Sequence, residues 1–183
     1  MRDKSRAIYK LILIATCAAF LTLCSWISFP FIVSFSLQIF AVFLICGCFS
    51  PSISLSAILL YILIGLIGVP VFSGFSSGAS AIMGASGGFI IAFIFASPII
   101  SIPQKRFSKS PAIYIFTMVI SLIVCYVCAC IWYAFVFCYP SRCSLLAAMS
   151  VCVFPFVIFD ILKILLASIV RKKLKPFIDK LPL

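Results

Sequence analysis

The sequence contains no histidine and no glutamate, and three aspartates are its only acidic side chains among 183 residues. Histidine and glutamate are frequent metal ligands and frequent general acids or bases. Their absence argues against a metal centre and against an enzyme, so no catalytic residue, metal site or cofactor is predicted. A membrane-bound transferase and a purely structural helical bundle are the weaker alternatives.

Charge is scarce in general. Charged residues make up 9% of the chain, whereas hydrophobic residues make up 66%. A soluble domain is about a quarter charged and about half apolar. The composition therefore predicts an all-α integral membrane protein, with residues 1–183 forming a single membrane domain in the lipid bilayer. The net charge of +11 is attributed to membrane orientation and not to nucleic-acid binding, because the cations flank apolar segments.

Six apolar segments are predicted to be transmembrane helices. The last of them is placed from Pro155, because proline is favoured in the first turn of a helix and disfavoured in its middle. Its length of about 20 residues, or ~30 Å, matches the hydrocarbon core of a bilayer. A short, half-buried helix over Leu145–Val153 is expected to precede it. The six expected spans are 7–26, 33–49, 53–67, 81–102, 112–137 and 155–174.

An even number of spans places both termini on the same side of the membrane. The amino-terminal tail, the loop 104–110 and the tail from Arg171 hold twelve of the fourteen lysine and arginine residues. Positively charged loops remain in the cytoplasm. Both termini are therefore predicted to be cytoplasmic in a multi-pass protein of the cell membrane. Arg142 and the glycine-rich stretch described next are expected to face outward.

Seven of the eight glycines lie between Gly65 and Phe93, between two long apolar segments. Non-helical backbone at membrane depth is tolerated only where protein buries it or where it lines a cavity. One interpretation is a ligand-lining loop. The other is a connector whose small residues allow tight helix packing.

Away from the ends of the predicted spans, Asp160 and Lys163 are the only ionisable residues other than tyrosines and cysteines. They are three residues apart, so they share one helix face. Such charges usually mark the pathway of a substrate or an ion, and the alternative is a structural ion pair. Both would lie in the outer half of the last span, at the depth of the glycine-rich stretch. Together they predict an outward-facing ligand pocket, and Gln38 in the second span is a further candidate for its lining.

Two smaller features leave alternatives open. Ala15 and Ala19 give the first span a smooth face, which serves either for packing inside the protein or for docking of a partner helix. Cys138 and Cys143 flank a loop, and whether they form a disulfide is left open.

Several motifs resemble those of the biotin-binding S component (BioY family) of energy-coupling factor transporters. The stretches Gly68-Val-Pro-Val-Phe-Ser-Gly74 and Gly84-Ala-Ser-Gly-Gly-Phe89 resemble the signature of that family. Phe35-Ser-Leu-Gln38 resembles the start of its second span. Phe154–Lys163, with a proline followed by Asp-x-x-Lys, resembles its last-span motif. The alanines of the first span match the family's docking motif.

The resemblance implies six helices, an outward-facing pocket for biotin, and a complex with a transmembrane T component and two ABC-type ATPases. The implied function is biotin uptake as the substrate-capture subunit. The alternatives are a stand-alone biotin facilitator and an S component for another small vitamin. Ala15 and Ala19 are the expected docking residues. The expected ligand-binding residues are Gln38, Phe72, Ser73, Gly74, Gly84, Ser86, Gly87, Arg142, Asp160 and Lys163.

Overall fold

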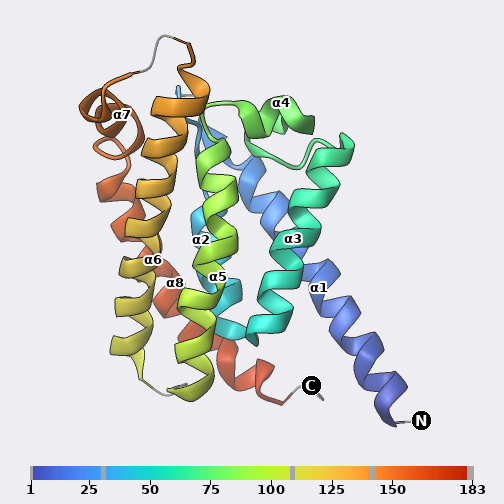
Figure 1. The fold of residues 1–183 in the computed structure, drawn as a ribbon. Coiled ribbons are helices and arrows are strands. Elements are labelled where there is room, and N and C mark those ends of the chain that lie inside the picture. The colour runs from blue at the N-terminus through green and yellow to red at the C-terminus, as the bar shows by residue number, and fades with distance from the viewer. Residues whose placement is uncertain (1, 30–31, 108–109, 141–142, 181–183) are drawn as a thin grey trace.

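The computed structural model describes residues 2–29, 32–107, 110–140 and 143–180, which fold into a bundle of helices (Figure 1). A two-stranded antiparallel hairpin, β1 (Ser28–Phe29) and β2 (Phe35–Ser36), follows the first helix. A single 3-10 turn, η1 (Ser73–Phe75), and a π-helical turn, η2 (Tyr133–Phe137), complete the described elements. The α-helices are α1 Arg2–Trp26, α2 Gln38–Cys48, α3 Pro51–Ile67, α4 Gly78–Met83, α5 Gly87–Arg106, α6 Pro111–Trp132, α7 Leu145–Cys152 and α8 Val157–Ile178.

Three helices in the described part of the chain are long and apolar enough to cross a membrane. They cover Arg6–Trp26, Gly87–Arg106 and Pro111–Phe137, the last being α6 together with η2. The pair α7 and α8 passes the same test as one broken span, bent by 50°. Helices α2 and α3 are apolar but shorter, with 11 and 17 residues. The expected all-helical membrane protein is therefore present with three or four candidate spans.

The helix boundaries differ from the expected spans at several places. The placement of the last helix from Pro155 is wrong, because Pro155 lies in the turn after α7 and α8 begins at Val157. The segment 33–49 becomes helical only at Gln38, because the hairpin occupies the residues before it. The segment 81–102 is divided into α4 and α5 by a turn over residues 84–86. Helix α8 continues through Pro176 to Ile178, where proline removes only a hydrogen bond of the last turn.

Helix α2 lies at the centre of the bundle and is buried along its whole length. It packs against α1, α3, α5 and α8, and α5 packs against α6 on its other side. Buried polar groups tie these helices together. The hydroxyl of Tyr114 on α6, for example, donates to the carbonyl oxygen of Phe43 on α2 at 2.7 Å. Because these neighbours enclose α2, this helix does not need to be as long as the bilayer is thick.

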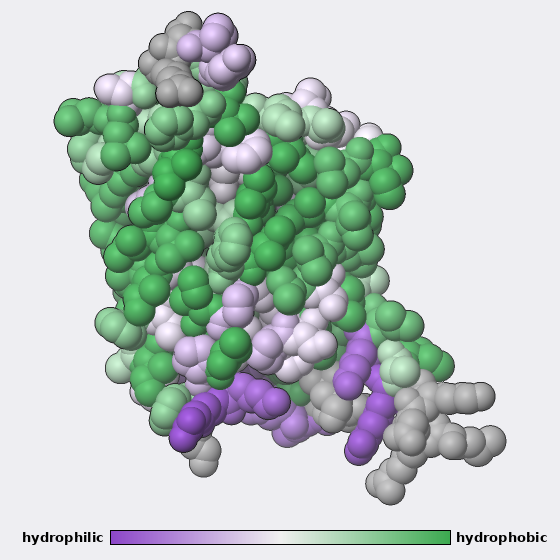
Figure 2. All heavy atoms as spheres, in the orientation of Figure 1, coloured by the Kyte–Doolittle hydropathy of each residue, from purple (hydrophilic) through white to green (hydrophobic). Residues whose placement is uncertain are grey.

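Both ends of the chain lie at one end of the bundle, together with the end of α5 and the start of α6 (Figure 1). Helices α4 and α7 lie toward the opposite end. On the side shown in Figure 2, hydrophobic residues form a broad band around the middle, and the most hydrophilic residues gather at the end that holds the termini. This distribution matches a protein that sits in a bilayer with one strongly basic end.

Candidate ligand-binding site

The centre of the site is a buried ion pair on α8. The ammonium Nζ of Lys163 lies 2.8 Å from Oδ1 of Asp160, and the two residues are only 4% and 1% exposed. The other carboxylate oxygen, Oδ2, accepts a 2.6 Å hydrogen bond from the hydroxyl of Tyr126 on α6. Asp160 lies in the first turn of α8, where the helix dipole favours a negative charge. Both carboxylate oxygens are thus engaged in a site away from water.

Lys163 also contacts an aromatic face. Its Nζ lies 4.0 Å above the centroid of the Phe35 ring, which comes from strand β2. A cation over an aromatic ring is attracted by the negative face of the π-system, more strongly where water is excluded. The hairpin therefore places an aromatic ring against the ion pair.

A cavity of about 30 Å³ lies beside the ion pair, between the hairpin, α2, α5 and α8. This volume suits a few waters at most and is far below the ~300–1,000 Å³ of pockets for drug-sized ligands. One part of the wall is polar, with serine hydroxyls, an amide and the two charges, and the remainder is largely aromatic. The lining residues are Val33, Ser34, Phe35, Ser36, Gln38, Ile39, Ser73, Ser86, Phe89, Phe93, Phe156, Asp160 and Lys163.

An apolar groove of about 280 Å³ adjoins this cavity and is lined by Phe29, Phe35, Pro155, Phe156 and Phe159. Phe35 and Phe156 line both spaces. Their rings are stacked, with centroids 6.0 Å apart and an interplanar angle of 4°. This aromatic pair is the wall between the polar cavity and the apolar groove, so moving it would join the two.

Gln38 is held at the start of α2 by a chain of hydrogen bonds. Its Nε2 donates to the hydroxyl of Tyr61 at 2.8 Å, and that hydroxyl donates to the carbonyl oxygen of Val71 at 3.2 Å. Ser25 of α1 donates to the same carbonyl oxygen. The amide is therefore oriented by α3 and by the loop before η1.

The turn between α4 and α5 supplies Ser86. Its Oγ accepts a hydrogen bond of 3.3 Å from the backbone N–H of Ser34, which ties this turn to the hairpin. Gly87 follows at a position without room for a side chain, since a Cβ there would lie 1.6 Å from the carbonyl oxygen of Ile82. The glycine-rich stretch thus includes both a tight packing contact and a residue of the cavity wall.

The cavity brings together five of the expected site residues, namely Gln38, Ser73, Ser86, Asp160 and Lys163. The other four described candidates do not line it. Phe72 is a core residue, packed edge-on against Tyr61 with ring centroids 5.4 Å apart. Gly74 lies on the exposed turn η1, where its φ of 69° favours glycine. Gly84 and Gly87 shape the α4–α5 turn. Arg142 lies outside the described residues.

Sequence reasoning did not select several residues that complete the site. Phe35 and Phe156 had local signals, because each lies within four residues of a chosen polar residue, Gln38 or Asp160. Tyr126 had none, since its partner Asp160 is 34 residues away on another helix. Only the packing of α6 against α8 identifies it.

The remaining predictions concern the alanines of the first span, a disulfide and a metal site. Ala15 and Ala19 are exposed on α1, whereas Ala18 between them is buried. Cys138 and Cys143 form a disulfide, with Cα atoms 5.9 Å apart. No group of side chains suited to a metal ion occurs among the residues that the structure describes.

Comparisons with known proteins bear on the whole chain. A family model described as the BioY family matches residues 1–180. The chain is 33% identical over 165 residues to the biotin transporter BioY2 of Lactococcus lactis subsp. cremoris, covering 88% of this chain and 87% of that protein. It is 32% identical over 152 residues to the biotin transporter BioY of Thermotoga maritima, covering 82% and 86%.

Among solved structures, the fold is similar to a crystal structure of the S-component for biotin from an ECF-type ABC transporter. The TM-score is 0.83, the sequence identity is 23%, and the match covers 94% of this chain and 93% of that one. This likeness shows that the two chains share a fold.

Proposed function

The chain belongs to the BioY family, and from that premise we propose that it captures biotin for uptake across the cell membrane as the S component of an energy-coupling factor transporter. Two relatives that this chain matches over more than four fifths of their length are named as biotin transporters. The observation in this chain that carries the proposal is the buried Asp160–Lys163 pair beside a cavity with polar and aromatic walls.

The chemistry of the cavity suits the ureido ring of biotin. That ring offers two N–H donors and one carbonyl acceptor, while Asp160 is an acceptor and Lys163 a donor. The thioether ring is apolar and matches Phe89 and Phe93 in the wall. Buried charges that are hydrogen-bonded to a neutral ligand contribute more than neutral hydrogen bonds do.

Biotin is larger than the cavity of about 30 Å³. We therefore expect binding to displace the stacked rings of Phe35 and Phe156, which would join the cavity to the apolar groove. The acyl chain of biotin then lies along Phe29 and Phe159. Its carboxylate is left to other polar groups, for which the hydroxyl of Ser73 and Arg142, which lies outside the described residues, are the candidates.

We place six crossings in the membrane, with both termini in the cytoplasm. Support comes from the shared location of the two termini at the basic end of the bundle (Figure 1). The short helices α2 and α3 count as crossings in this arrangement because neighbouring helices shield them from lipid over part of their surface. The glycine-rich stretch and the cavity then face outward.

The partners in this proposal are a T component and two ABC-type ATPases. The sequence contains no phosphate-binding loop of its own, so energy for uptake has to come from elsewhere. Exposed Ala15 and Ala19 leave a smooth strip on α1 where another helix can approach closely. The alternative is a facilitator that moves biotin alone.

Titration of the purified protein with biotin, thiamine and riboflavin tests the proposal. We expect low-nanomolar binding of biotin and at least about a thousandfold weaker binding of the other two, a difference of ~4 kcal/mol. Tight binding of another vitamin without binding of biotin would contradict it. Uptake into proteoliposomes with and without the T component and ATPases distinguishes an S component from a stand-alone facilitator. An S component accumulates biotin against a gradient only with these partners, whereas a facilitator does not do so in either case.

A further inference from the structure

A second cavity, unrelated to the first, lies at the end of the bundle that holds the termini. It is a groove of about 510 Å³ along the last three turns of α8, closed on one side by Pro111 at the start of α6. Ser168, Arg171, Lys172, Lys175 and Asp179 line it. Their spacing of three or four residues places them on one helix face.

The groove carries three cations and one acid. Lys175 and Asp179 are four residues apart, yet no ion pair within 4.0 Å joins them or involves Lys172 among the described residues. The hydrogen bonds found in that part of the chain also leave both lysine ammonium groups unengaged. The groove thus has positive charge in excess, with two lysines available for a ligand.

Arg171 lines the groove, and its side chain is held in place by contacts with three other helices. Its Nε donates to the carbonyl oxygen of Gly47 at 2.8 Å, and its Nη2 donates to Oε1 of Gln104 at 2.6 Å. Its guanidinium also lies 4.4 Å from the centroid of the Tyr114 ring. Arg171 on α8 therefore contacts α2, α5 and α6. These contacts hold its buried positive charge in a fixed position.

The surface next to the groove is apolar. Leu165 is 49% exposed and lies three residues before Ser168 on the same face of α8, and Ile169 beside it is 57% exposed. Exposed apolar side chains also occur on α6, where Phe116 is 64% exposed. The first turn of α6 adds the positive end of its helix dipole at the groove. A ligand that binds both the basic groove and the apolar surface has an anionic head group and apolar chains.

We propose that this groove binds the phosphate group of an anionic phospholipid, whose acyl chains lie along the exposed apolar faces of α6 and α8. Basic pockets at the cytoplasmic ends of membrane helices suit anionic headgroups, with about 1 kcal/mol for each lysine or arginine near the surface. Lys172 and Lys175 contact the phosphate, and Asp179 opposes it. This site is independent of biotin and of any transport partner.

The test uses the full-length protein in neutral detergent, titrated with phosphatidylglycerol or with phosphatidylcholine of the same acyl chains and followed by native mass spectrometry. We expect retention of phosphatidylglycerol only. Lys172→Gln and Lys175→Gln each weaken its binding about fivefold. Lys175→Arg preserves it, because the charge remains, and Asp179→Asn strengthens it.

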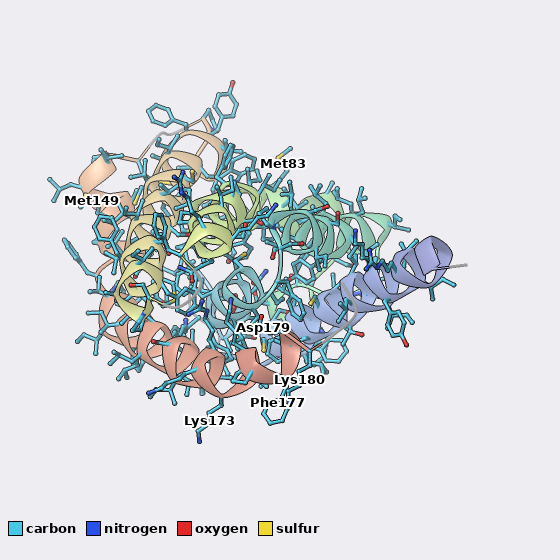
Figure 3. The ribbon with its side chains drawn as sticks, turned by 90° about the horizontal axis from the view of Figure 1, so that it is seen from below. Met83, Met149, Lys173, Phe177, Asp179 and Lys180 are labelled. Carbon is cyan, nitrogen blue, oxygen red and sulfur yellow. A yellow bond between two sulfur atoms is a disulfide. The ribbon has the colours of Figure 1, made fainter. Side chains whose placement is uncertain are left out.

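Lys173→Gln is the matched control. It removes the same charge from the neighbouring position, but the Lys173 side chain points away from the bundle (Figure 3) and does not line the groove. We expect this variant to bind phosphatidylglycerol like the unchanged protein. An equal loss in the Lys173 and Lys175 variants would show diffuse attraction by the basic tail and overturn the site.

Two further outcomes also overturn the proposal. Equal retention of the two lipids would show that the headgroup charge is not recognised. Displacement of phosphatidylglycerol by an equimolar concentration of glycerol phosphate would show a site for free phosphate, in which the apolar faces of α6 and α8 have no part. Unchanged melting temperatures across the variants show that binding, and not folding, was altered.

Discussion

Asp160 and Lys163 bury two opposite charges on one face of α8. Desolvation of such a pair often costs more than the attraction between the charges returns, unless further hydrogen bonds complete it. Tyr126 supplies one of these bonds, and the ring of Phe35 supplies a favourable face for the ammonium. The surroundings therefore stabilise the pair, which lines a small cavity with a partly polar wall.

Asp160→Asn is expected to weaken biotin binding by ~2–4 kcal/mol, and Lys163→Ala by a similar amount, because each leaves the other charge buried without its partner. The double variant should lose less than the sum, since in the proposed site both residues contact one ligand group. Affinity and melting temperature are to be measured on the same preparations. A purely structural ion pair makes the opposite forecast, in which folded protein is lost first and the surviving fraction binds biotin normally.

Tyr126→Phe removes only the hydroxyl that donates to Asp160. We expect biotin binding to weaken by ~1 kcal/mol, about fivefold, because the carboxylate loses one of the two contacts that orient it. Isothermal titration measures the change. Tyr133→Phe serves as the control, because the tyrosine hydroxyls that form hydrogen bonds in the described part of the chain are those of Tyr61, Tyr114 and Tyr126. Equal effects of the two substitutions would exclude an orienting role for Tyr126.

Sequence reasoning reached the charged part of the cavity and not its aromatic wall. Charges inside an apolar span are conspicuous, so Asp160 and Lys163 were identifiable from their position and spacing alone. The chain contains 20 phenylalanines, so the sequence alone does not indicate which of them line a cavity. Which rings face the cavity depends on how the hairpin folds over α8, and that contact joins residues more than a hundred positions apart.

Helix α1 is the least enclosed of the long helices, and its amino-terminal half diverges from the bundle (Figure 1). Ile8, Leu11 and Ile12 are more than half exposed there. On this helix Ala18 is buried, while Ala15 and Ala19 are exposed. The outward alanines are the ones available to a partner helix.

Ala15→Trp and Ala19→Trp are expected to leave biotin binding unchanged in the isolated protein and to reduce uptake in the presence of a T component. A bulky ring on the outer face prevents close approach of another helix without disturbing the core. Ala18→Trp is the contrasting variant, because overpacking a buried site costs ~1–3 kcal/mol or more and should lower the melting temperature. Loss of biotin binding in the Ala15 or Ala19 variant would show that this face has a structural role instead.

The limits of prediction at the scale of elements lie where tertiary contacts override length and hydropathy. Two-residue strands leave no periodic signal, so the hairpin that shortens α2 could not be inferred. The division between α4 and α5 depends on the close approach of Gly87 to Ile82, which a run of small residues does not specify. Long apolar helices such as α6 were predictable because their composition alone determines them.

At the scale of the molecule, charge and topology agree. The end of the bundle that holds both termini also holds the basic residues that end α5 and α8. The cavity adjoins the hairpin, which with α4 lies toward the other end. Cations near apolar spans are retained in the cytoplasm. In the orientation proposed from these features, the cavity opens to the outside, where a nutrient would be captured.

Cysteine labelling of intact cells tests this orientation. In a cysteine-free background, Ser80→Cys on α4 should react with a membrane-impermeant maleimide, because this residue is exposed at the end opposite the termini. Lys105→Cys at the end of α5 is also exposed but should react only after the membrane is permeabilised. Ile90→Cys, which is buried in α5, should stay unlabelled in both conditions and controls for unfolding. Labelling of Lys105→Cys from outside, with protection of Ser80→Cys, would invert the topology. The biotin cavity would then face the cytoplasm, and a role in uptake would lose its geometric basis.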